Sequence, residues 1–80
     1  MSTIGERLRA ARLRRVWTQD DLARESGVPI VTISRWENGH VAGLPRQSTI
    51  RKLAAALDVD PAWLLLGDEA GEVGKEAAAA

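Results

Sequence analysis

Apolar side chains recur at helical intervals along most of this chain. The first group, Ile4, Leu8 and Ala11, has the i, i+4, i+7 spacing of one helix face and predicts an amphipathic helix over residues 3–15. A similar group over residues 50–57 predicts a fourth helix. No segment alternates between apolar and polar positions for long enough to predict a strand. The pattern therefore predicts an all-α fold.

Helix start and stop signals place a second and a third helix between these two. Thr18 and Asp21 form a variant of the capping box, and Gly27 ends the second helix about two turns later. The third helix covers residues 29–38 and ends at Gly39, in the position after the C-cap where glycine is common. Both helices are therefore expected to be short and closely connected.

The end of the chain divides into a last helix and a segment without helical pattern. Asp60 followed by Pro61 is an N-cap with proline at the first helical position, and this fifth helix ends at Gly67. Residues 68–80 contain Gly, Ala and charged residues but no sustained apolar face, so we expect them to be poorly ordered. The predicted organisation is one domain over residues 1–67 and an acidic, Ala-rich C-terminal segment.

Composition excludes several classes of function. The chain has 80 residues, no Cys and one His, which excludes a disulfide scaffold, a thiolate metal site and a cysteine nucleophile. No apolar run approaches the roughly 20 residues of a membrane span, and charge interrupts any signal peptide. No catalytic arrangement or Gly-rich phosphate loop is evident. We therefore expect a cytoplasmic protein that is not an enzyme, needs no cofactor or metal and does not contact a membrane.

Charge is distributed unevenly although the formal net charge is zero. Residues 1–57 hold ten bases against five acids, a net charge of +5, and residues 58–80 hold one base against six acids, a net charge of −5. Nine of the ten bases are Arg, whose planar guanidinium suits phosphates and guanine edges. The front of the chain is thus typical either of a nucleic-acid-binding protein or of a helix face solvated by arginines.

The predicted third helix has an unusual outward face. At about 100° per residue, Ile33 and Trp36 point inward. The opposite arc holds Ile30, Val31, Ser34, Arg35 and Asn38. Two β-branched apolar residues on an outward face indicate a partner. On DNA they would contact thymine methyl groups while Arg35 binds guanine O6 and N7, whereas on protein the same arc would form a small dimer patch. Geometry alone does not decide between DNA and protein as the partner.

Five motifs in register resemble the phage repressor and Cro type of helix-turn-helix domain, the xenobiotic response element family. They are Ile4-Gly5-x-x-Leu8, Thr18-Gln19-Asp20-Asp21-Leu22-Ala23 with Gly27-Val28, Ile33-Ser34-Arg35-Trp36-Glu37-Asn38-Gly39, Leu53-Ala54-x-Ala56-Leu57-x-Val59 and Trp63-Leu64-Leu65-x-Gly67. The resemblance covers residues 4–67. It implies a five-helix lambda-repressor-like bundle in which the second and third helices form the helix-turn-helix.

The resemblance also implies roles for single residues. The family's base-contacting positions correspond to Ile30, Val31, Ser34 and Arg35. Its phosphate-contacting positions correspond to Gln19, Thr32 and Asn38, and the long connection before the fourth helix adds His40 and Arg46 as candidates. Arg12 is a further phosphate candidate, because a paired, half-buried arginine can also present a donor to phosphate. Arg12 and Glu37 match a family ion pair that ties the first helix to the third. The alternative for Gln19 is a plain helix-start residue, and the phosphate contact is favoured. Asn38 can serve as a C-cap and a phosphate contact together, and Thr32 lies near the inward arc.

Two departures from the family pattern affect the predicted reading of DNA. At Ile30 and Val31 many relatives carry hydrogen-bonding residues, so base reading here would depend on methyl contacts. Pro29 stands where a Ser or Thr cap is usual, which leaves the start of the helix without a side-chain acceptor.

These inferences predict a sequence-specific DNA-binding repressor of the cytoplasm, associated with the nucleoid when bound to double-stranded DNA. A homodimer on a palindromic site is expected, with Leu64, Leu65 and Leu66 as candidates for its interface. An antitoxin with a toxin partner and a restriction-modification controller are alternatives of the same fold. A protein-interaction module that does not read DNA is the alternative from another class.

Overall fold

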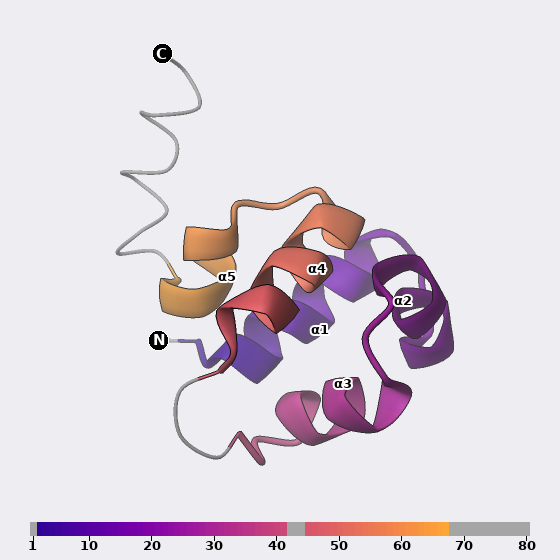
Figure 1. Cartoon of the computed structure of the whole chain (residues 1–80), viewed down its shortest axis with the longest axis horizontal. Coiled ribbons are helices and arrows are strands. Elements are labelled where there is room, and N and C mark those ends of the chain that lie inside the picture. Colours follow the sequence, from indigo (N-terminus) through magenta and orange to yellow (C-terminus); the bar gives the residue numbers. More distant parts are fainter. Residues whose placement is uncertain (1, 42–44, 68–80) are drawn as a thin grey trace.

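The computed structural model describes residues 2–41 and 45–67, and this part of the chain contains five helices and no strand (Figure 1). The helices are α1 (Ile4–Arg14), α2 (Gln19–Ser26), α3 (Ile30–Glu37), α4 (Gln47–Leu57) and α5 (Pro61–Leu66). The predicted all-α fold is confirmed, with every helix in its expected place. The segment that we expect to be poorly ordered, residues 68–80, lies outside the described residues.

Side-chain caps start three of the five helices. Thr3 and Thr18 each accept a hydrogen bond from the backbone N–H three residues later, and Glu6 and Asp21 complete both capping boxes. The hydrogen bonds from Thr18 lower the pKa of the Asp21 carboxyl below its usual value, so this cap is complete at neutral pH and is lost on strong acidification. Asp60 caps α5 in the predicted way. Helices α3 and α4 start without a side-chain cap.

A tight turn joins α2 to α3 and sets the angle between them. Gly27 ends α2 with a φ of 76°, in the left-handed region that glycine adopts without strain. Val28 is buried in the core, and Pro29 is the residue before α3. Gly27 therefore reverses the chain, and Val28 anchors the turn in the core.

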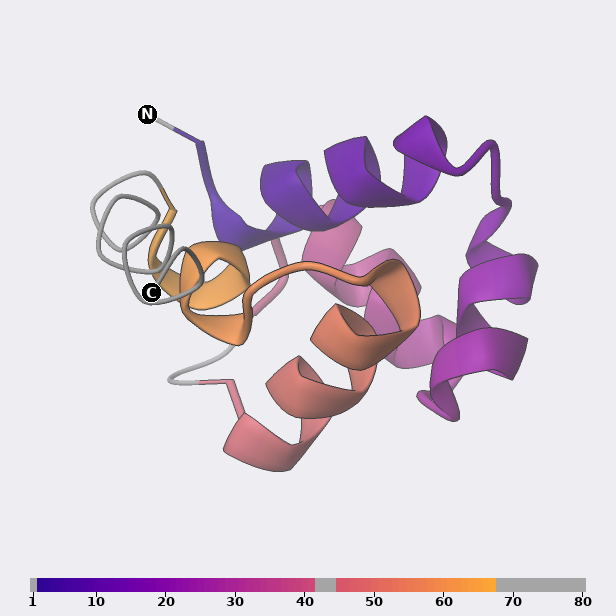
Figure 2. The ribbon, with the colours of Figure 1, turned by 90° about the horizontal axis from the view of Figure 1, so that it is seen from above.

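Each helix contributes one large, fully buried side chain to a single core. These residues are Leu8, Leu22, Ile33, Leu53 and Leu64. α1 packs against α3 and α5, α2 packs against α3 and α4, and α4 packs against α5 (Figure 2). The burial of Leu64 corrects its prediction as a dimer-interface residue, because a side chain that is 0 % exposed inside its own domain cannot contact a second copy.

The turn after α1 contains a strained residue. Val16 has a φ of 56°, its N–H donates to the Leu13 carbonyl at 2.9 Å, and its side chain is 88 % exposed. Glycine is usual at this position of a helix end, and a residue with a Cβ atom pays about 1–2 kcal/mol for the left-handed conformation. Packing inside the domain offsets none of this strain, because Val16 is so exposed.

We expect Val16→Gly to raise the free energy of unfolding by about 0.5–1 kcal/mol, since the relief of strain exceeds the extra backbone entropy of glycine in the unfolded chain. Urea unfolding followed by circular dichroism measures the change. Val16→Ala is the matched control, because it removes the branched side chain but keeps the Cβ atom and should gain less. Equal gains in the free energy of unfolding for the two variants would contradict a backbone origin of the strain at Val16.

Candidate nucleic-acid interface

α3 turns one face to the core and the other to solvent, as its helical pattern predicts. Ile33 is 0 % and Trp36 8 % exposed, so these two side chains anchor the helix. On the outer face Ile30 is 42 % and Val31 56 % exposed, and Arg35 is exposed as well. Two apolar side chains and a guanidinium thus share one solvent-facing surface, which is the chemistry needed for thymine methyl groups and a guanine edge.

The C-terminal end of α3 is polar and exposed. Asn38 caps the helix through its backbone N–H, and its side-chain Nδ2 donates to Ser34 Oγ at 3.5 Å. Ser34 is half-buried, so of the predicted base-reading residues it is the least accessible. The capping role and the predicted phosphate contact of Asn38 are compatible, because the cap uses the backbone and leaves the amide at the surface.

The predicted ion pair between α1 and α3 is present. Arg12 Nε donates to Glu37 Oε2 at 2.8 Å and Arg12 Nη2 donates to Glu37 Oε1 at 2.7 Å, a two-pronged contact. The Arg12 side chain is 9 % exposed and that of Glu37 3 %. The hydrogen bonds to Glu37 raise the pKa of Arg12 above its ordinary value despite burial, so the guanidinium stays charged. This pair fixes the orientation of α3 on the domain.

Glu37 also receives a side chain from α2. Gln19 is half-buried, and its Nε2 donates to Glu37 Oε1 at 3.3 Å. Because Asn38 directly follows Glu37, the structure brings the predicted phosphate ligands Gln19 and Asn38 to the same end of α3. The sequence pattern names both residues but does not show that one carboxylate positions the first of them.

The arginine of this pair has little capacity left for DNA. Its third nitrogen, Arg12 Nη1, donates to the Trp17 carbonyl at 2.7 Å, so all three guanidinium nitrogens bind protein oxygens. The phosphate contact of Arg12 stays a prediction. Arg7 is 7 % exposed and Arg12 8 %, so two of the ten bases at the front of the chain are withdrawn from the surface.

The remaining predicted phosphate ligands lie around the start of α4. Thr32 and Arg46 line a hollow of about 420 Å³ together with Pro29, Trp36, Val41, Pro45 and Thr49. Thr32 is half-buried, as its place near the inward arc predicts, whereas Arg46 and His40 are exposed. Residues 42–44 of the same connection lie outside the described part. The hollow joins two hydroxyl groups to one guanidinium, which are donors that phosphate oxygens accept.

Sequence reasoning missed the role of Arg7. Its Nε donates to the Leu64 carbonyl at 3.0 Å and its Nη2 to the Leu65 carbonyl at 2.9 Å, so a buried cation holds the C-terminal end of α5. A signal was available in the helical pattern. With Ile4 at 0°, Arg7 falls at about 300°, beside Ala11 at about 340° and inside the apolar arc. A base within an apolar arc indicates a buried, paired side chain.

Three further observations concern the described residues as a whole. None of their helices is long and apolar enough to cross a membrane. Residues 2–41 and 45–67 contain no group of three or more His, Asp or Glu side chains that could hold a metal ion. Every buried side-chain nitrogen or oxygen in the same ranges has a hydrogen-bond partner.

The sequence is similar to those of known regulators. A family model described as helix-turn-helix matches residues 8–64. The chain is 49 % identical over 59 residues to the HTH-type transcriptional repressor RghR of Bacillus subtilis (strain 168), a match that covers 74 % of this chain and 43 % of that protein. It is 37 % identical over 67 residues to the HTH-type transcriptional regulator DicA of Escherichia coli (strain K12), covering 84 % and 48 %. The matches span less than half of each relative's length.

The fold is similar to that of a repressor solved on DNA. The P22 c2 repressor protein, in a crystal structure with synthetic operator 9T in the presence of Tl+, superimposes with a TM-score of 0.76 at 35 % identity. The match covers 85 % of this chain and 100 % of that one. The expected bundle of the phage-repressor type is therefore confirmed.

Proposed function

The chain belongs to the helix-turn-helix family, and from this membership we propose that it is a sequence-specific DNA-binding transcription regulator that acts as a repressor on the nucleoid. The observation that carries the proposal is the outer face of α3, where Ile30, Val31 and Arg35 are exposed. Similarity to the RghR and P22 c2 repressors supports repression rather than activation.

In this proposal α3 enters the major groove and reads base edges directly. Arg35 donates two hydrogen bonds to O6 and N7 of a guanine, which no other base pair offers in that arrangement. Ile30 and Val31 contact the 5-methyl groups of thymines, and such contacts recover the cost of exposing two β-branched side chains. The operator half-site is thus expected to combine a guanine with neighbouring thymines.

Phosphate contacts on both sides of the groove hold α3 in register. Gln19 and Asn38 supply amide donors at one end of α3, where Glu37 orients the first of them. Thr32 and Arg46 supply donors at the hollow near the start of α4, and His40 lies on the same connection. These contacts carry no sequence information. The contact of Arg46 also makes the affinity depend on salt, because its guanidinium displaces counterions from the phosphates.

We expect Arg35→Ala to weaken binding to the selected operator by about 1–3 kcal/mol and to relax specificity at one base pair. Asn38→Ala, which removes a proposed phosphate contact, should weaken binding to all DNA sequences alike. Fluorescence anisotropy on the operator and on single-base variants measures both effects. Equal losses on every sequence after Arg35→Ala would contradict its base-reading role.

Selection from randomised duplex DNA at two salt concentrations tests the proposal as a whole. Recovery of a palindromic motif, with affinity that falls steeply as salt rises, supports a specific regulator and supplies its operator. Weak binding without a motif would contradict it and would favour the alternative in which the Ile30 and Val31 face binds a protein.

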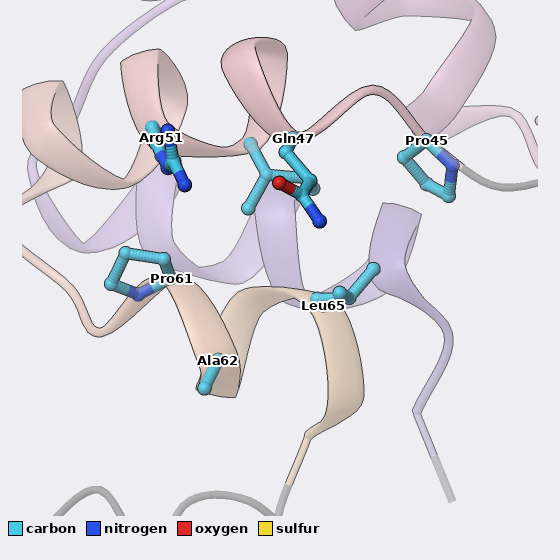
Figure 3. A pocket seen from close by; sticks show the side chains of 7 residues that line it. Pro45, Gln47, Arg51, Pro61, Ala62 and Leu65 are labelled. Carbon is cyan, nitrogen blue, oxygen red and sulfur yellow. The ribbon is translucent and has the colours of Figure 1, made fainter.

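We further propose that the regulator is a homodimer through the α4 and α5 side of the domain. Leu66 is 60 % exposed and Leu65 half-buried at the end of α5. Beside them lies a groove of about 210 Å³ (Figure 3), lined by Pro45, Gln47, Ile50, Arg51, Pro61, Ala62 and Leu65. A two-fold axis here lets each copy present the same groove and leucines to the other, and two half-sites about 34 Å apart then face two copies of α3.

Leu66→Asp is expected to shift the protein from dimer to monomer, because the substitution places a charge in an apolar contact. Sedimentation velocity over a concentration series measures the mass. Leu13→Asp is the matched control, since Leu13 is also an exposed leucine, at 50 %, but lies on α1. An unchanged mass for Leu66→Asp at concentrations where the parent is dimeric would contradict this surface.

A further inference from the structure

The second half of α1 and the turn that follows it carry exposed residues that neither the DNA-reading face nor the proposed dimer uses. We call it the α1 ridge, and its members are Arg9, Leu13, Arg14, Arg15 and Val16. Leu13 is 50 % and Val16 88 % exposed. The three arginines are exposed, and among the described residues none of them forms a salt bridge. The ridge therefore joins an apolar pair to three positive charges that have no acidic partner among the described residues.

The backbone of the ridge indicates a contact beyond the described domain. Val16 lies in the left-handed region with a φ of 56°, and its side chain is held in solvent. Neither local conformation nor packing within the domain favours valine here. The guanidinium of Arg15 lies 4.8 Å from the centre of the Trp17 ring, so this end of the ridge has a fixed form. Strain at an exposed apolar residue is typical of a binding surface.

The chain contains a segment of matching chemistry. The described residues hold ten bases against seven acids, a net charge of +3. Residues 68–80 hold four acids against Lys75, a net charge of −3, so the two parts neutralise each other. Val73 is the one large apolar residue in the segment, and it stands between Glu72 and Glu76. The segment thus offers carboxylates around a single apolar side chain.

The last described residue, Gly67, also lies beside α1. A Cβ atom added to Gly67 would lie 2.8 Å from Arg7 Nη1, so the last described residue is in contact with a side chain of α1. Arg7 and Arg15 are eight residues apart, about 12 Å along a helix axis. Thirteen residues span at most about 45 Å when fully extended. Residues 68–80 can therefore reach the whole α1 ridge of their own chain.

We propose that residues 68–80 dock on the α1 ridge of the same chain, with their carboxylates on Arg9, Arg14 and Arg15 and Val73 against the apolar pair. Because Arg15 is close in sequence to Thr18 and Gln19, at the phosphate-binding end of the interface, the docked segment competes with DNA phosphates for this positive surface. This second step rests on the proposed DNA-binding function, whereas the docking itself does not.

Backbone amide NMR spectra of the full chain test the docking without DNA. The Glu69→Gln/Glu72→Gln/Glu76→Gln variant neutralises the segment, and we expect it to shift the amides of residues 9–17 while leaving those of α3 in place. The same neutralisation in an Arg14→Gln/Arg15→Gln background should cause no further shift there. In an Arg24→Gln/Lys52→Gln background, which removes equal charge from α2 and α4, the shift should persist. Shifts elsewhere, or none, would overturn the docking.

Affinity for a duplex of random sequence tests the competition. The Glu69→Gln/Glu72→Gln/Glu76→Gln variant is expected to bind this duplex about 3–10 times more tightly than the parent protein at low salt. The difference in affinity should vanish near 1 M salt, where charges are screened within about 3 Å. Equal affinities at low salt would overturn the competition. If neither protein binds DNA, the proposed function and the competition fail together, while the NMR shifts still decide whether the segment docks.

Discussion

Gly5→Ala is expected to lower the free energy of unfolding by about 3 kcal/mol, at the upper end of what overpacking costs. A Cβ atom at this position would lie 2.0 Å from the Trp36 carbonyl oxygen and 2.9 Å from its carbon. Both atoms belong to the backbone of α3, so no side chain can rotate away. α1 and α3 would have to separate, and the core between them would lose contacts.

Thermal unfolding followed by circular dichroism measures this loss, and a domain of this size should melt about 12–24 °C lower. Gly39→Ala is the matched control. A Cβ atom there would meet nothing within 4 Å, and only its φ of 82° opposes alanine. The control should therefore cost about 1–2 kcal/mol. A Gly5 variant no less stable than the Gly39 variant would contradict the close approach of α1 and α3.

The close approach bears on function because it decides where α3 stands. Gly5 allows the backbone of α1 to contact the backbone of α3 at Trp36. The ion pair of Arg12 with Glu37, the next residue of α3, holds the same two helices together. A larger residue at Gly5 would move the proposed DNA-reading face together with the helix. Variants at this position are thus expected to lose operator affinity even under conditions in which they remain folded.

Local signals explain why the helices could be predicted from the sequence. Thr18 with Asp21 starts α2, Gly27 ends it, and the inward pair Ile33 and Trp36 determines which face of α3 is outside. Each of these features acts over a few residues, so the linear pattern contains it. The Arg12 and Glu37 pair, 25 residues apart, was available only through the family resemblance.

Features that depend on packing between distant elements could not be predicted. Three leucines in a row end the six-residue helix α5, and only the position of that helix on the core makes Leu64 buried and Leu66 exposed. The hydrogen bond from Gln19 to Glu37 depends on the angle between α2 and α3. The contact of Gly5 with the backbone of α3 is similarly invisible in a one-dimensional pattern.

Glu37→Leu is expected to be as damaging as Gly5→Ala, lowering the free energy of unfolding by about 3–5 kcal/mol. The substitution would leave Arg12 charged and 9 % exposed beside an apolar side chain, with one of its three protein hydrogen bonds remaining. Urea unfolding measures the change. Arg24→Ala is the control, since its bonds to Asp20 and Asp21 involve a side chain that is 71 % exposed and should contribute less than about 1 kcal/mol.

The double variant Arg12→Met/Glu37→Leu separates the stabilising role of the pair from its role in orienting α3. Replacing a buried ion pair by apolar side chains of similar size is often neutral, so we expect most of the lost stability to return. Operator affinity should not return with it, because Gln19 then lacks the carboxylate that positions its amide for the proposed phosphate contact. A double variant that regains both stability and full affinity would show that the pair serves stability alone. One that regains only stability would show that Glu37 also positions the residues of the proposed phosphate contacts.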